Sequence, residues 1–106
     1  MKLRWLLTMM NLFGTFDIRD AMRSGAVIVD VRTEAEYVGF HIKGAFNIPY
    51  DEIEKSIETI QSWHKPIIVY STYGLRGRLA AKKLRKYGIA VWPSTRDQLC
   101  ELLAST

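Results

Sequence analysis

Two short runs of apolar, largely β-branched residues constrain the fold of this chain more than any other sequence feature. The runs span residues 26–30 and 66–70, and neither alternates between apolar and polar side chains. Each therefore predicts a strand that is buried on both faces, as in a parallel sheet covered by helices. With 106 residues, the chain has room for one such core and not for two.

Helical signals lie between and after these runs. A capping box of Thr33 and Glu36 predicts a helix that begins at about Glu34. A further helix, capped by Asp51, is expected to bury an apolar stripe formed by Ile53, Ile57 and Ile60.

Two more strands are expected at 44–49 and 89–92, and two more helices at 17–23 and after the cap residue Ser94 or Thr95. Strands that alternate with helices predict an α/β fold. In this fold, a central, mostly parallel sheet of about four to five strands carries helices on both faces.

The chain is predicted to form a single domain over 1–106, with an N-terminal helical extension at 1–14. The apolar run at 5–13 follows two basic residues and has the outline of a signal peptide, but it holds Asn11 and lacks a small-x-small cleavage site. It is also shorter than the roughly 20 residues of a membrane span. We therefore expect no membrane contact and a cytoplasmic location, and the alternative is a periplasmic form with an N-terminal signal.

The longest predicted helix runs from about Arg76 to Tyr87 and is stopped by Gly88. Between Ser71 and Gly88 the chain has six basic residues and no acidic one, although its net charge is only +4. The basic face suits an acidic protein partner, and the alternative is a plain solvated face. It lacks the motifs of nucleic-acid-binding domains, so no nucleic acid is expected. The core-facing positions are assigned to Ala80, Ala81, Leu84 and Tyr87. The solvent side carries Arg78, Lys82, Arg85 and Lys86.

A single cysteine and two histidines limit the chemistry of the chain. Cys100 has no partner for an internal disulfide, and a cysteine-rich zinc site is excluded. We expect no metal ion and no cofactor. Cys100 lies among the leucines of the last predicted helix, which favours a core or half-buried residue over a remote sulfur carrier.

The segment after the second buried run is the candidate site. Ligands of parallel α/β sheets bind beyond the carboxyl ends of the strands, and Ser71 lies at such an end, before a helix. With Gly74 relaxing the turn, successive backbone amides are expected to form a concavity that favours an anion, and Arg76 is expected to add a guanidinium fork. The alternative is an ordinary strand-to-helix turn. The candidate anion-binding loop consists of Ser71, Thr72, Tyr73, Gly74, Leu75, Arg76 and Gly77.

Five segments together resemble the rhodanese-like family of sulfurtransferase domains. They are 27–32 with Asp-Val-Arg, 36–37, 41–49 with His-Ile-x-Gly-Ala-x-Asn-Ile-Pro, 68–76 and 79–81. Their order and separation cover most of the chain. The resemblance implies a rhodanese-like fold, and it implies a small oxyanion or a sulfane-sulfur donor as the ligand.

The resemblance also implies where the chemistry would lie. Family members with sulfurtransferase activity carry Cys-x-x-Gly-x-Arg in this loop, and their cysteine holds a sulfane sulfur as a persulfide. This chain has Ser71 at the position of the cysteine and Arg76 at the position of the arginine. A serine hydroxyl stays protonated at neutral pH and cannot form a persulfide. The activity is therefore left open, and its loss is favoured.

Other catalytic arrangements have less support. Asp30 and Arg32 end the first buried run on the side of the loop and predict a buried ion pair that braces it, with a surface ion pair as the alternative. A serine nucleophile needs a base, usually a histidine, but His41 and His64 lie in segments that suggest no such role. The related dual-specificity phosphatase loop has the pattern Cys-x5-Arg, which is one residue longer than the loop of this chain.

Two functional hypotheses remain. The first is a rhodanese-like domain without persulfide chemistry that serves as an anion-binding or protein-interaction module. The second is a thiosulfate or thiol sulfurtransferase whose nucleophilic cysteine is replaced by Ser71.

Overall fold

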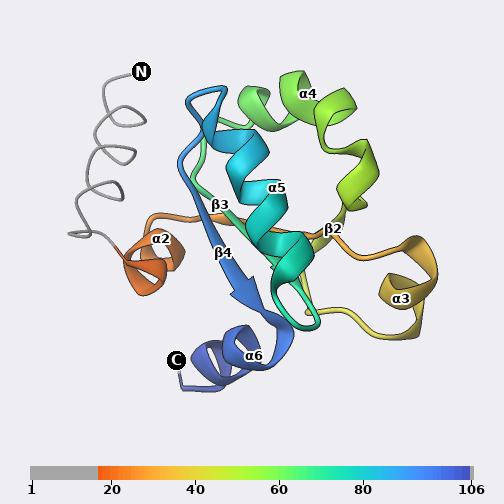
Figure 1. The fold of residues 1–106 in the computed structure, drawn as a ribbon. Coiled ribbons are helices and arrows are strands. Elements are labelled where there is room, and N and C mark those ends of the chain that lie inside the picture. The colour runs from red at the N-terminus through yellow and green to blue at the C-terminus, as the bar shows by residue number, and fades with distance from the viewer. Residues whose placement is uncertain (1–16, 106) are drawn as a thin grey trace.

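The computed structural model of the protein describes residues 17–105, and the extension expected at 1–14 lies outside the described residues. No helix in the described part is long and apolar enough to cross a membrane. Figure 1 shows how the elements follow one another. They are α2 (Ile18–Arg23), β1 (Val27–Asp30), α3 (Glu34–Gly39), β2 (Phe46–Asn47), the 3-10 turns η1 (Tyr50–Glu52) and η2 (Glu54–Ser56), α4 (Ile57–Ser62), β3 (Ile67–Ser71), α5 (Leu75–Arg85), β4 (Val91–Thr95) and α6 (Arg96–Ala104).

Four parallel strands form the central sheet in the order β2-β1-β3-β4 (Figure 1). The two runs that dominate the sequence become its central pair, β1 and β3, with Val27 opposite Ile67 and Asp30 opposite Tyr70. Every residue of β3 is buried, as expected for a strand covered on both faces. The predicted α/β fold is confirmed, with four strands in the sheet.

Successive residues of β3 face two separate cores, because side chains alternate along a strand. Ile67 and Val69 pack into the core that lies under α4 and α5. Ile68 and Tyr70 pack into the other core, with Ala21 of α2 and α6 residues that include Leu99. Figure 1 shows these two pairs of helices on opposite sides of the sheet, so the helices cover both faces as predicted.

Short polar caps fix where two helices begin. The Thr33 Oγ1 accepts from the Glu36 amide at 3.2 Å, and the Glu36 Oε1 accepts from the Thr33 amide at 3.0 Å. This capping box starts α3 at Glu34, as predicted. Thr95 caps α6 by accepting from the Gln98 amide at 3.1 Å.

The helix expected to begin at Asp51 is broken into two 3-10 turns followed by α4. Asp51 lies inside the first turn and does not act as the cap. The Ser56 Oγ donates to the Glu52 carbonyl at 3.1 Å, and the Ser56 backbone has left helical geometry. Serine competes in this way with the helical hydrogen-bond pattern. The apolar stripe is nevertheless buried as expected, at Ile53, Ile57 and Ile60.

The ends of two other elements also differ from the prediction. Helix α5 ends at Arg85, and Gly88, with a φ of 73°, lets the chain turn away, so Tyr87 remains 48% exposed instead of entering the core. Strand β4 begins later than expected and continues through Pro93. Proline is tolerated there because β4 is an edge strand. In the segment expected as a strand at 44–49, just two residues pair with β1.

Candidate functional site

The candidate loop joins the end of β3 to the start of α5. Gly74 precedes α5 and has a φ of 92°, a conformation that side chains disfavour. A Cβ at this position would also lie 3.2 Å from the Thr95 Cγ2 and 3.3 Å from an Arg78 guanidinium nitrogen. The tight turn after Ser71 therefore requires glycine.

The Ser71 hydroxyl lies in the middle of this turn. Ser71 is 1% exposed, and its Oγ accepts hydrogen bonds from the amides of Gly74 and Gly77, each at 3.1 Å. A hydroxyl oxygen has two lone pairs, so both are occupied by backbone donors. What Ser71 still offers to a ligand is its hydrogen.

Four other amides of the loop remain available. The amides of Thr72, Tyr73, Leu75 and Arg76 have no protein acceptor among the described residues. They lie at the N-terminal end of an 11-residue helix, where the peptide dipoles favour negative charge. Of the amides expected to form the cradle, those of Gly74 and Gly77 are thus bound by Ser71.

The Arg76 guanidinium is held by Glu36 of α3. Its two terminal nitrogens donate to the two carboxylate oxygens of Glu36 at 2.7 and 3.0 Å. This bidentate pair joins α3 to the start of α5. The Arg76 guanidinium, which was expected to face the loop, is instead directed towards Glu36. The hydrogen bond from Arg76, followed by that from the Thr33 amide, lowers the pKa of Glu36 to about 2.

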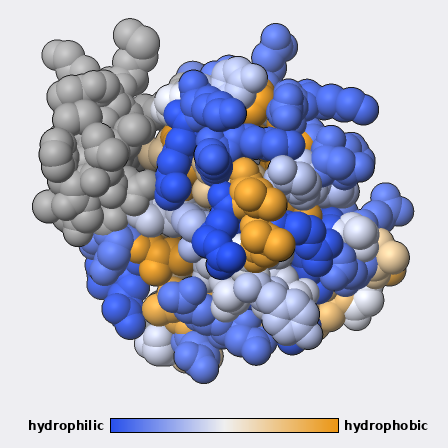
Figure 2. Space-filling model, viewed as in Figure 1, coloured by the Kyte–Doolittle hydropathy of each residue, from blue (hydrophilic) through white to orange (hydrophobic). Residues whose placement is uncertain are grey.

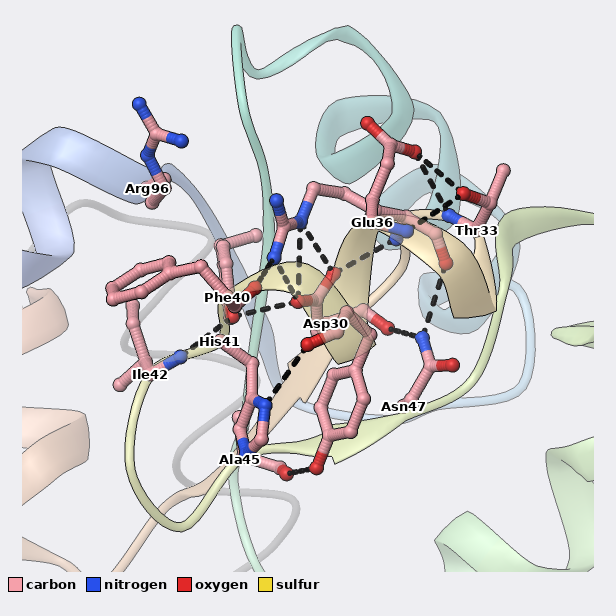
Figure 3. Close-up of polar contacts among 12 residues, drawn as sticks. Asp30, Thr33, Glu36, Phe40, His41, Ile42, Ala45, Asn47 and Arg96 are labelled. Atoms are coloured by element: carbon pink, nitrogen blue, oxygen red, sulfur yellow. Dashed lines mark hydrogen bonds and ion pairs between the residues drawn. The ribbon is translucent and has the colours of Figure 1, made fainter.

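The expected buried pair of Asp30 and Arg32 is present at the end of β1, and Figure 3 shows the contacts around Asp30. The Arg32 Nε and Nη2 donate to the Asp30 carboxylate at 2.8 to 3.1 Å, and the Arg32 amide donates to it at 2.9 Å. The Tyr70 hydroxyl, on the neighbouring strand, also donates to Asp30, at 2.7 Å. The buried carboxylate is therefore surrounded by donors.

This network reaches the connection between α3 and β2. The Ile42 amide donates to the Tyr70 hydroxyl at 3.1 Å, and Arg32 donates to the Phe40 carbonyl. The Asn47 side chain donates to the carbonyls of both Asp30 and Arg32 at 3.0 Å. Figure 3 shows these groups converging around Asp30. Burial raises the pKa of Tyr70 to about 12, so its hydroxyl remains a donor at neutral pH.

Glu36, Tyr70 and Asn47 were not identified as site residues from the sequence. Glu36 appeared as a helix cap, and Tyr70 and Asn47 appeared within the motif segments, but their partners lie far away along the chain. A buried tyrosine and a partly buried asparagine at strand ends each need a hydrogen-bond partner. That requirement was the one signal available for finding them.

The two histidines and the cysteine lie apart from the Ser71 hydroxyl. The His41 ring stacks on Tyr37 with centroids 3.8 Å apart, and its Nδ1 lies 3.0 Å from the Tyr37 carbonyl oxygen. His64 is exposed in the turn after α4. Cys100 lies half-buried on α6. Within residues 17–105, no histidine hydrogen-bonds Ser71, so no base is in place to activate it.

A model of the rhodanese-like domain family matches residues 15–93. The chain belongs to the rhodanese-like domain family. This rhodanese-like domain is 38% identical over 63 residues to the uncharacterized protein YqhL of Bacillus subtilis (strain 168). That match covers 59% of the chain and 49% of YqhL, so the chain spans about half the length of this relative.

Solved structures of similar proteins share the fold of this rhodanese-like domain. The human single-domain sulfurtransferase TSTD1 has a TM-score of 0.61 and 26% identity, over 79% of this chain and 89% of that one. The reduced Bacillus anthracis CoADR-RHD has a TM-score of 0.62 and 32% identity, over 76% and 14%. Protein hp1203 of Helicobacter pylori has a TM-score of 0.62 and 22% identity, over 73% of each chain, and shows the fold alone.

The Ser71→Ala variant is expected to be less stable by about 1–3 kcal/mol, because it leaves the buried amides of Gly74 and Gly77 without an acceptor. Urea unfolding followed by circular dichroism measures the difference. Ser105→Ala is the matched control, since Ser105 is exposed at the end of α6. An equal, small change in both variants would contradict the assigned role of the Ser71 hydroxyl.

The Glu36→Gln variant tests the ion pair with Arg76 through pH. A carboxyl whose pKa is lowered by folding stabilises the protein above its unfolded pKa, and this stabilisation is lost as the pH falls through the folded pKa. The stability difference between the unchanged protein and Glu36→Gln should therefore be full at pH values above 4.5 and shrink towards pH 2. Urea unfolding at several pH values measures it, with Glu58→Gln, an exposed position, as control. A difference that does not vary with pH would refute the assignment.

Proposed function

We propose that this rhodanese-like domain does not transfer sulfur through its loop and that it binds small oxyanions there through backbone amides. The observation that carries the proposal is the Ser71 hydroxyl, which occupies the centre of the loop and accepts from the amides of Gly74 and Gly77. The loop thus keeps the form of a binding site while its central atom is an oxygen.

Sulfur transfer requires an atom that this loop lacks. A thiolate attacks the outer sulfur of thiosulfate, forms an S–S bond and releases sulfite. A serine hydroxyl is protonated at neutral pH and forms no persulfide. Its lone pairs are occupied here, and no histidine contacts it within residues 17–105. These facts support a loop without covalent chemistry.

Oxyanion binding is supported by the amides of Thr72, Tyr73, Leu75 and Arg76. A charge at a helix terminus contributes about 0.3–1 kcal/mol, and up to about 2 kcal/mol when it is partly buried. A millimolar dissociation constant corresponds to about 4 kcal/mol. Several amides must therefore act together, because the Arg76 fork is engaged by Glu36. The expected affinity for sulfate or thiosulfate is in the millimolar range.

The Ser71→Cys variant separates this proposal from the alternative, a sulfurtransferase whose cysteine is replaced. A thiolate at this position would accept from the same two amides at the helix N-terminus, which would lower its pKa. We expect Ser71→Cys, made together with Cys100→Ser, to gain the mass of one sulfur atom after exposure to thiosulfate. We expect the Cys100→Ser chain with Ser71 intact to gain none. Electrospray mass spectrometry measures both, and a cyanide assay follows the transfer.

Three results of that experiment have distinct meanings. Sulfur transfer to cyanide by the chain that retains Ser71 would overturn the proposal. Sulfur uptake by the Ser71→Cys variant would instead show that the missing thiol alone prevents persulfide formation. An inert Ser71→Cys variant would show that the rest of the loop no longer supports persulfide formation either.

An anion titration tests the second part of the proposal. Sulfate at millimolar concentration should shift the amide NMR signals of the four free loop amides more than chloride does at equal ionic strength. The Glu36→Gln variant releases Arg76 and should tighten sulfate binding by about twofold to fivefold, the equivalent of one helix-terminal charge interaction. Glu58→Gln removes the same charge elsewhere and serves as control. Signals that stay unmoved at tens of millimolar would remove the anion role.

A further inference from the structure

The exposed side of α5 carries four basic side chains that no carboxylate neutralises. Of the six basic residues in this segment, Arg76 is paired with Glu36, and Lys83 is paired with Glu54 at 3.1 Å. The other four are exposed and form no ion pair within residues 17–105, although Arg85 donates to a backbone carbonyl. These four are Arg78, Lys82, Arg85 and Lys86.

Apolar side chains continue this basic surface towards the loop. Leu75 and Leu79 are 57% and 39% exposed, and Tyr73, in the loop itself, is 90% exposed. Figure 2 shows hydrophobic side chains surrounded by hydrophilic ones on the face where Figure 1 places α5. An exposed apolar group rimmed by polar residues is typical of an interaction site.

Helical spacing aligns the two kinds of residue. Positions that are four, seven and eleven residues apart lie on one face of a helix. Leu75, Leu79, Lys82 and Lys86 have this spacing, and Arg78 and Arg85 flank them on one side. We call these six residues the α5 stripe. It is apolar at the end next to the Ser71 loop and basic at the other end.

We propose that the α5 stripe docks an acidic segment of a partner protein, with apolar side chains on Leu75 and Leu79 and carboxylates along the basic end. Charge complementarity argues for an acidic occupant, since four unpaired cations lie together with no acid among them. The exposed leucines argue for a protein, because a segment with aliphatic side chains covers apolar surface that phosphates would leave exposed. The proposal does not depend on anion binding by the loop.

Two other occupants compete with a partner protein. A nucleic acid would engage the cations through its phosphates and could stack a base on the exposed Tyr73, but it would leave Leu75 and Leu79 uncovered. A second copy of the chain would offer its own acidic surface, such as the pocket of about 350 Å³ lined by Glu34, Asp51 and Glu52. Both occupants are therefore included in the test.

The test uses the full chain, labelled with ¹⁵N, and synthetic peptides. The first peptide has two leucines one helical turn apart followed by glutamates, and the second has serines in place of the leucines. The first peptide is expected to shift the amide signals of the α5 stripe and Tyr73, and to bind more tightly than the second. Its affinity should fall as salt is added, because exposed charge contacts are screened.

Matched charge reversals locate the contact. The double variant Arg78→Glu and Lys82→Glu should weaken binding of the first peptide by roughly tenfold, equivalent to about 1.4 kcal/mol. The double variant Lys43→Glu and Lys55→Glu makes the same change in net charge at exposed positions away from the stripe and should bind nearly as before. Circular dichroism checks that both variants are folded.

Several results would overturn the proposal. One is a pair of peptides that bind equally well, or not at all at millimolar concentration. Another is a similar loss of affinity in both charge-reversal variants. Tighter binding of duplex DNA than of the first peptide would assign the stripe to nucleic acid. Concentration-dependent dimerisation that Asp51→Lys abolishes would assign it to a second copy of the chain.

Discussion

The buried carboxylate of Asp30 determines how the carboxyl end of the sheet is built. Removing a charge from water costs several kcal/mol unless donors surround it. Here Arg32 supplies three of its nitrogens, including the amide, and Tyr70 supplies its hydroxyl. Because Tyr70 also binds the Ile42 amide, the same carboxylate sets the position of the chain between α3 and β2. The end of β3, where Ser71 begins the loop, is held by this arrangement.

Among the described residues, acidic residues near the loop pair with only two of the six basic residues between Ser71 and Gly88, and this distribution determines where positive charge remains. Glu36 engages Arg76, and Glu54 engages Lys83, so these two cations of α5 are neutralised by neighbouring carboxylates. The remaining cations are exposed along the outer side of the helix, and the guanidinium of one of them, Arg78, lies beside Gly74 of the loop. A small anion in the loop would meet backbone amides with the Arg78 guanidinium beside them, whereas an extended acidic partner would meet the row of side chains along the helix. The two proposed binding modes use different chemistry on adjacent surfaces.

Local sequence signals predicted most of the fold. The β-branched runs form β1 and β3, the capping box begins α3, and Gly88 turns the chain shortly after the end of α5. Two failures occurred where a single residue interrupts a periodic pattern: Gly88 turns the chain so that Tyr87 stays exposed, and the Ser56 hydroxyl breaks the helix near Asp51. The site was predicted as a loop with a buried pair, but the contact between Glu36 and Arg76 joins residues 40 positions apart. No local pattern specifies such a pairing.

An oxygen at the centre of the loop also changes how the domain responds to oxidants. A cysteine activated by a helix terminus is oxidised step by step by peroxide, and the later products are irreversible. The Ser71 hydroxyl does not undergo these oxidation steps, so the geometry of the loop does not depend on the redox state of its surroundings. The chain has one sulfhydryl, that of Cys100, and it lies half-buried on another helix. Any binding that depends on this loop should therefore persist through oxidative stress that would silence a thiol-bearing homologue.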